Sequence, residues 1–117
     1  MSVSPLIGKS KTFALETIKV CNEVKASKRE SVLTNQLIRS GTSIGANIRE
    51  AFYAHSRADF ISKLHIALKE TAETEYWLRL LQMSEYINGE LSASLLQDCL
   101  EIKRILVASI NTAKSAE

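Results

Sequence analysis

The sequence predicts an all-α protein, folded as an antiparallel up-down-up-down four-helix bundle. Three observations lead to this fold class. Apolar residues recur at alternating three- and four-residue steps along most of the chain, which is the spacing of one helix face. The composition favours helix, with one proline and four glycines in 117 residues. The turn signals are short, so consecutive helices are expected to pack as antiparallel neighbours.

Length and composition fit one domain over residues 1–117. A chain of this length with 45% hydrophobic residues can bury one core. No apolar run approaches the roughly 18 residues that a membrane span needs, and the N-terminus lacks the apolar region of a signal peptide. We therefore expect a cytoplasmic protein without membrane contact.

The first helix is expected to begin at Ser4, which would cap it, with Pro5 at the first helical position. Its stripe ends near Ala26 and comprises Phe13, Ala14, Ile18 (or Thr17), Cys21 and Val24. The polar residues 25–30 predict a loop or a frayed junction whose basic tip is Lys28 and Arg29.

The second helix is predicted over residues 30–55 and contains the sequence QLIRSGTSIGANIREA at positions 36–51. Two glycines, Gly41 and Gly45, lie one turn apart in its apolar stripe, which also holds Leu37, Ile44, Ile48 and Ala51. Each glycine inside a helix costs about 1 kcal/mol relative to alanine. We therefore predict that another helix packs closely against this segment.

The third and fourth helices complete the bundle. Ser56 and Asp59 have the spacing of a capping box and begin a helix that extends to about residue 86. Its stripe comprises Phe60, Leu64, Ala67 with Leu68, Thr71, Thr74, Leu78 and Leu81. Asn88-Gly89 predicts a turn with a left-handed helix stop. The last helix covers residues 90–114, with an inner face of Leu91, Leu95, Cys99, Ile102, Leu106 and Ile110.

Enzyme motifs are weak in this chain. Residues 41–45 match G-x-S-x-G, which would make Ser43 a hydrolase nucleophile, but that motif requires a strand-to-helix turn and this segment is helical in pattern. A di-iron bundle needs Glu-x-x-His pairs, and neither His55 nor His65 follows a glutamate at that spacing. The sequence predicts no catalytic residue, metal, cofactor or small-molecule substrate.

The two cysteines and the distribution of charge carry different information. Cys21 and Cys99 form no ligand cluster and lie on apolar stripes, so we expect buried, inert thiols. Residues 1–57 carry nine basic residues against four acidic ones, and residues 58–117 carry six against nine. This asymmetry indicates either a basic binding face or charge complementarity between helices.

Two further sets of residues leave alternatives open. Glu70, Glu73 and Trp77 share a face of the third helix, and helix two offers Arg39, Asn47, Arg49 and Glu50 across from it. These residues either fix the register between the helices or line a binding groove. A second apolar set favours a subunit interface over a wide core, and it comprises Ile38, Phe52, Ile61, Trp77, Leu80, Leu96 and Ile105.

From residue 9 to residue 114 the chain resembles the bacterial 23S rRNA intervening-sequence proteins. QLIRSGTSIGANIREA and DFISKLHIALKETAETEYWLRLL carry the resemblance. In the first block the matching positions are Arg39, Ser40, Gly41, Ser43, Ile44, Gly45, Asn47, Glu50 and Ala51. In the second they are Phe60, Lys63, Ala67, Glu70, Glu73, Tyr76, Trp77 and Leu78. The chain departs from the family at Arg49, where an acidic or small residue is frequent.

The resemblance implies four-helix protomers in a homopentameric ring and implies no catalytic activity. The related accessory proteins of diversity-generating retroelements bind nucleic acid through a basic surface. We therefore expect a homo-oligomer that binds RNA or DNA, with a structural or protein-interaction module as the alternative. The expected nucleic-acid contacts are the solvent-facing cations of the basic half: Lys19, Lys25, Lys28, Arg29, Arg49 and Arg57.

Overall fold

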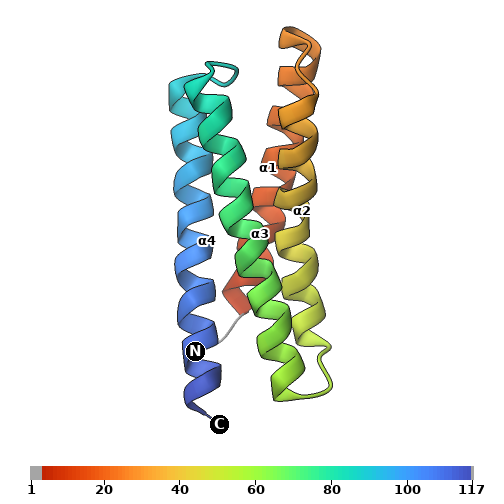
Figure 1. Cartoon of the computed structure of the whole chain (residues 1–117), viewed down its shortest axis with the longest axis vertical. Coiled ribbons are helices and arrows are strands. Elements are labelled where there is room, and N and C mark those ends of the chain that lie inside the picture. Colours follow the sequence, from red (N-terminus) through yellow and green to blue (C-terminus); the bar gives the residue numbers. More distant parts are fainter. Residues whose placement is uncertain (1–3, 117) are drawn as a thin grey trace.

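The computed structural model describes residues 4–116 and contains four α-helices in this range (Figure 1). The helices are α1 (Ser4–Lys28), α2 (Val32–Phe52), α3 (Arg57–Met83) and α4 (Gly89–Ser115). They run antiparallel to their neighbours and form a rod of 49 × 21 × 19 Å. No strand occurs among the described residues, so the predicted all-α four-helix bundle is confirmed.

The helices do not share their contacts equally. The α2–α3 interface is the most extensive, whereas α1 and α4 meet over the smallest interface. The α1–α2 and α3–α4 connections lie at one end of the rod (Figure 1). The α2–α3 connection lies at the other end, together with the start of α1 and the end of α4. Consecutive helices therefore run in opposite directions along the rod.

The core follows the predicted stripes with two local differences. On α1, Thr17 is fully buried and Ile18 is exposed, which decides between the two predicted positions. On α3, Ile61 is buried and Phe60 is only partly buried, so the prediction placed the start of this stripe one residue too early. The remaining predicted stripe residues on α3 are buried or pack against the core.

The first connection is shorter than predicted. The structure continues α1 to Lys28 and leaves only residues 29–31 outside a helix, so the predicted loop over residues 25–30 is wrong. Arg29 adopts a left-handed conformation (φ 56°) directly after the helix. Glu30, which is only 9% exposed, then accepts hydrogen bonds from the amides of Leu33 (2.8 Å) and Thr34 (2.9 Å). These bonds satisfy the free amides at the start of α2.

The other helix ends also differ from the predictions in detail. Helix α1 already includes Ser4, which was predicted to precede it as the cap. The position before Ser4 lies outside the described residues. The structure ends α2 at Phe52, so His55 belongs to the connection. Ser56 accepts a hydrogen bond from the amide of Asp59 (3.1 Å), as the capping box predicted.

The helix stop predicted at Asn88-Gly89 is wrong. Helix α3 ends earlier, with Glu85 in the left-handed conformation (φ 63°). The amide of Tyr86 donates to the carbonyl of Leu81 and the amide of Glu85 to that of Gln82, which together form a Schellman motif. Asn88 begins the next helix instead, because its side chain accepts a hydrogen bond from the amide of Leu91 (2.8 Å).

The two glycines of α2 lie against α1, as predicted. A Cβ atom built on Gly41 would lie 3.2 Å from Cγ2 of Thr17. One built on Gly45 would lie 3.2 Å from the hydroxyl of Ser10. Both distances are shorter than a comfortable van der Waals contact, so the absent side chains allow α1 and α2 to pack at this separation.

Candidate functional site

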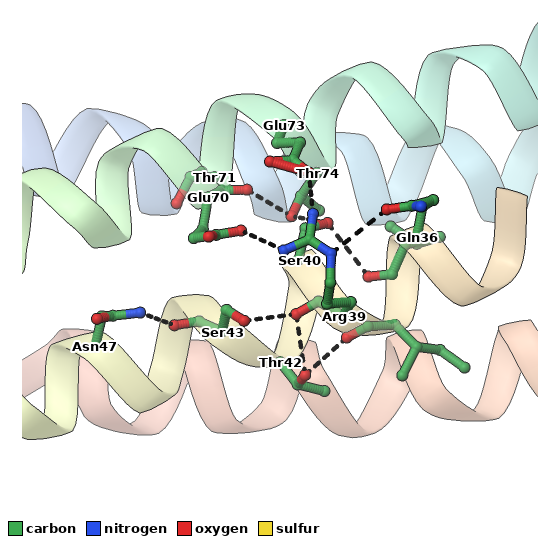
Figure 2. A network of polar contacts seen from close by, with 12 residues as sticks. Gln36, Arg39, Ser40, Thr42, Ser43, Asn47, Glu70, Thr71, Glu73 and Thr74 are labelled. Carbon is green, nitrogen blue, oxygen red and sulfur yellow. Dashed lines mark hydrogen bonds and ion pairs between the residues drawn. The ribbon is translucent and has the colours of Figure 1, made fainter.

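Arg39 connects α2 to α3 on the outside of the bundle. Its guanidinium forms ion pairs with Glu70 (3.4 Å) and with Glu73, and it also donates to the side chain of Gln36 (3.4 Å). Figure 2 shows Arg39 pointing from α2 toward the two carboxylates. The two glutamates lie one turn apart, so one cation bridges both. The arrangement favours the interpretation that these charges fix the register of the two helices.

Small hydroxyl and amide side chains of the same segment bond locally. Ser40 and Thr74 share a buried hydrogen bond between α2 and α3, with 2.9 Å between their oxygen atoms (Figure 2). Ser43 donates to the carbonyl of Arg39 (2.7 Å), and Asn47 donates to that of Ser43 (2.8 Å). Ser43 therefore lies within a regular helix, without the sharp turn that exposes a hydrolase nucleophile.

The remaining charged residues of α2 separate onto two sides. Glu50 forms an ion pair with Lys63 of α3 (3.4 Å). Arg49 was expected to face helix three, and this prediction is wrong: it lines a depression between α1 and α2. One residue of rotation along a helix is about 100°, which places these neighbours on different flanks.

A second bridge connects α3 to α4. Glu75 lies 3.1 Å from the ammonium of Lys103 and 3.0 Å from the guanidinium of Arg79. The hydrogen bond from Lys103 is the main reason why the pKa of Glu75 is lower than usual, and it outweighs the effect of partial burial. The outer polar contacts of α3 thus hold it to both neighbouring helices.

Neither cysteine resembles a reactive thiol. Cys21 and Cys99 are fully buried and unpaired. Burial raises the pKa of each thiol to about 12, so the nucleophilic thiolate is scarce at neutral pH. Within residues 4–116, no three His, Cys, Asp or Glu side chains gather in a way that could hold a metal ion. No described helix is long and apolar enough to cross a membrane.

Apolar side chains extend beyond the core. Trp77 is partly buried and meets the ring of Tyr76 edge to face, with centroids 5.1 Å apart. Of the second apolar set, Ile61 is buried, Phe52 is 42% exposed, and the others are partly buried: Ile38, Trp77, Leu80, Leu96 and Ile105. Large apolar side chains with still greater exposure include Leu15, Tyr53, Tyr76 and Met83. The protomer therefore retains apolar surface that another molecule could cover.

The six cations expected to contact nucleic acid do not form one patch on a protomer. Lys28 and Arg29 lie at the end of the rod that holds the α1–α2 connection. Arg49 and Arg57 lie near the opposite end, where Arg57 donates to the carbonyl of Ala113 (3.3 Å). Lys19 is exposed along α1, and Lys25 is half-buried rather than solvent-facing. Among the described residues, none of the six forms an ion pair.

The depression beside Arg49 has a volume of about 340 Å³ and is called here the α1–α2 groove. Most of its lining side chains are small, and two are cations. The residues that define it are Ile7, Ser10, Lys11, Ala14, Thr42, Gly45, Ala46 and Arg49. No carboxylate occurs among the described residues that line it. The sequence reasoning missed Lys11. Lys11 precedes Ile18 by seven residues and Lys25 by fourteen, so all three lie on one side of a helix. This spacing was the available signal that Lys11 shares a helix face with a predicted contact residue, Lys25.

Comparisons with known proteins agree with this fold. The model of the 23S rRNA-intervening sequence protein family matches residues 5–108. A solved structure from Bacteroides thetaiotaomicron VPI-5482, a protein with unknown function from the S23 ribosomal protein family, is 50% identical to the chain. The match covers 89% of this chain and 96% of that one, with a TM-score of 0.87. No curated protein matches the chain. The chain therefore belongs to the 23S rRNA-intervening sequence protein family.

Proposed function

We propose that this protein is a non-enzymatic homo-oligomer that binds RNA or DNA through basic surface on its N-terminal half. The observation that carries the proposal is that some cations of this protein form ion pairs with carboxylates and others do not. In the described part of the chain, four cations after residue 57 form ion pairs: Lys63, Arg79, Lys103 and Arg104. Lys9 and Arg39 of the N-terminal half are also paired, whereas the six cations proposed as contacts have no carboxylate partner there, and of these Arg57 donates to the carbonyl of Ala113. Cations without internal partners are available to phosphates.

Lys28 and Arg29 are the strongest candidates within this set. Both are exposed, and they occupy adjacent positions at one end of the rod. In a ring of parallel-oriented protomers, that pair would repeat around one rim and form a multivalent basic surface. Contacts of this kind bind the sugar–phosphate backbone, so we expect little sequence preference and a steep dependence on salt.

Fluorescence anisotropy with a mixed RNA and DNA pool tests nucleic-acid binding. Binding should be present at low salt and weaken toward physiological salt. Lys28→Glu combined with Arg29→Glu should reduce affinity and lower the salt slope by about two for each protomer whose pair contacts the nucleic acid, because each lost phosphate contact removes about one unit. The matched control, Lys69→Glu with Lys114→Glu, makes the same charge change at two other exposed cations, which form no ion pair with any described residue.

The control should bind nearly as well as the unmodified protein. Equal weakening by both pairs would mean that overall charge, and not the end of the rod, determines binding. If the folded oligomer does not bind even at low salt, the nucleic-acid proposal is wrong. The alternative, a structural or protein-interaction module, would then be the better explanation of the exposed apolar surface.

Self-association is the second part of the proposal, and a pentamer is the expected form. The exposed and half-exposed apolar side chains described above support it, because a contact between protomers would remove their apolar area from water. Light scattering coupled to size exclusion should give a mass near five times the 13.0 kDa protomer. A stable mass of one protomer across the accessible concentration range would contradict this prediction.

A further inference from the structure

The α1–α2 groove has the features of a protein-docking surface. Its small lining residues would allow another backbone or an apolar side chain to approach closely. Lys11 and Arg49 line it without ion pairs in the described part of the chain. No aromatic side chain lines it for a base to stack upon. A lining of small apolar and hydroxyl side chains with two cations fits a protein surface that carries carboxylates better than it fits a nucleic acid.

The opposite flank of α1 carries such a surface. There Glu16 of α1 lies near Asp98 and Glu101 of α4, and these three residues are called here the α1–α4 acidic face. Partial burial raises the pKa of Asp98, and the nearby carboxylates of Glu101 and Glu16 raise it further, while the nearby ammonium of Lys9 offsets part of this rise. Lys9 and Arg104 both contact Glu101, at 2.8 and 3.9 Å. No ion pair involves Asp98 or Glu16 within the described residues.

An exposed apolar residue lies between the two surfaces. Leu15 is 61% exposed and sits on the outer side of α1, one turn after Lys11 and next to Glu16. It is the most exposed large apolar side chain of α1. Placed against a neighbouring molecule, it would fill part of a shallow depression that small lining residues leave open.

We infer that the α1–α2 groove of one protomer binds the α1–α4 acidic face of a second copy of this chain. This inference rests on the self-association proposed above and names one contact that would contribute to it. The charges are complementary, and both surfaces flank α1, so each protomer can use its groove toward one neighbour and its acidic face toward the other. Such a contact is heterologous, and because the two surfaces lie on adjacent sides of the bundle, its repetition turns toward a closed ring.

The assignment divides the basic residues between two tasks. Lys11 and Arg49 would contact the neighbouring protomer, whereas Lys28 and Arg29 at the end of the rod would remain accessible to nucleic acid. Arg49 would then be removed from the set of phosphate contacts. Substitutions of Lys11 and Arg49 should therefore change the mass of the assembly, and substitutions of Lys28 and Arg29 should change the affinity for nucleic acid.

A charge-swap series with light scattering over a range of protein concentrations tests this docking. Lys11→Glu with Arg49→Glu makes the groove acidic, and Glu16→Lys with Asp98→Lys makes the opposing face basic. Each pair should raise the protomer concentration needed for half-assembly by about tenfold or more, because like charges then meet across the contact. All four substitutions in one chain should restore assembly, because the charges are complementary again. Circular dichroism checks that each variant is folded.

The control for these variants is Lys69→Glu with Lys114→Glu, which should assemble like the unmodified protein. If the unmodified protein is an oligomer and either swapped pair leaves its mass unchanged, the docking inference is wrong while the proposed oligomer stands. Failure of the four-site variant to reassemble also overturns the inference. If the groove variant still assembles but no longer binds nucleic acid, the groove is a nucleic-acid contact instead. If the unmodified protein is a monomer, both the proposed oligomer and the docking inference are wrong.

Discussion

Three helical glycines occupy different environments in this bundle. Gly41 and Gly45 face α1, where an added Cβ would meet Thr17 or Ser10 at 3.2 Å. Gly8 lies within α1 and has no atom within 4 Å of its hypothetical Cβ. The same substitution should therefore gain helix propensity at one position and encounter a neighbour at the other two.

We predict that Gly8→Ala stabilises the protein by about 0.5–1 kcal/mol, because alanine is the better helix former and the space is open. Gly45→Ala should gain less than Gly8→Ala, since Ser10 must move to admit the methyl group. Gly45→Leu should destabilise by about 1–3 kcal/mol or more through overpacking. Urea unfolding monitored by circular dichroism measures all three. An equal gain for the two alanine variants would contradict the importance of close approach at Gly45.

At the scale of the element, Glu30 shows how one side chain begins a helix. Its carboxylate accepts two amide hydrogen bonds at the start of α2, while the preceding Arg29 turns the chain out of α1. Partial burial would raise the pKa of Glu30, but the hydrogen bonds from Leu33 and Thr34 lower it more. The ionised carboxylate is therefore the form that stabilises the connection.

We predict that Glu30→Gln costs about 1 kcal/mol of stability at neutral pH, as the loss of a helix cap does. Because the pKa of Glu30 is lower in the folded state, its contribution is complete above the ordinary value of 4.5 and is lost as the pH falls through the folded value. The difference from the unmodified protein should thus shrink below pH 4.5. Glu23→Gln, at an exposed position of α1, serves as the control. A difference that does not change with pH would contradict this role.

The elements that the sequence predicts best are those with a repeated apolar pattern. Four helices, their order and most of their buried residues follow from that period. Helix ends were less predictable, because the stop of α3 uses Glu85 in a left-handed conformation without the glycine that usually marks it. Asparagine is common both in turns and at helix N-caps. The role of Asn88 therefore depends on where α4 begins, which the local sequence does not specify.

The candidate sites divide in the same way. The bridge from Arg39 to Glu70 and Glu73 was one of two interpretations that the spacing allowed, and the geometry favours it. The position of Arg49 could not be predicted, because it depends on which flank of α2 meets α1. The α1–α2 groove brings together residues more than thirty positions apart, and no local pattern reports such a depression.

At the scale of the whole molecule, the two buried thiols report on opening of the bundle. Cys21 lies on α1 and Cys99 on α4, and each has a pKa of about 12. A labelling reagent needs the thiolate and access to it, so reaction requires the helices to separate. These helices share the smallest interface in the bundle.

We predict that both thiols react slowly with an aromatic disulfide reagent at pH 8, and that the rate rises with urea in parallel with unfolding. An introduced exposed thiol, Ser62→Cys, should react at once and shows that the reagent is active. Rapid native-state labelling of either cysteine would indicate local separation of α1 from α4. Colorimetric detection of the released product measures the rate of each thiol in the single-cysteine variants Cys21→Ala and Cys99→Ala.

The short α1–α2 connection has a consequence for proteolysis. Lys28 and Arg29 stand at the end of a helix that leaves only three residues before the next one begins, and both are exposed. Trypsin cleaves after lysine and arginine, so this corner is a natural point of limited digestion, and a cut there would separate α1 from the other three helices. Bound RNA or DNA would shield the same peptide bonds. The amount of uncut protein that remains on a gel after trypsin treatment would then report how much of the protein is bound to nucleic acid. Neither the protein nor the nucleic acid would need a label.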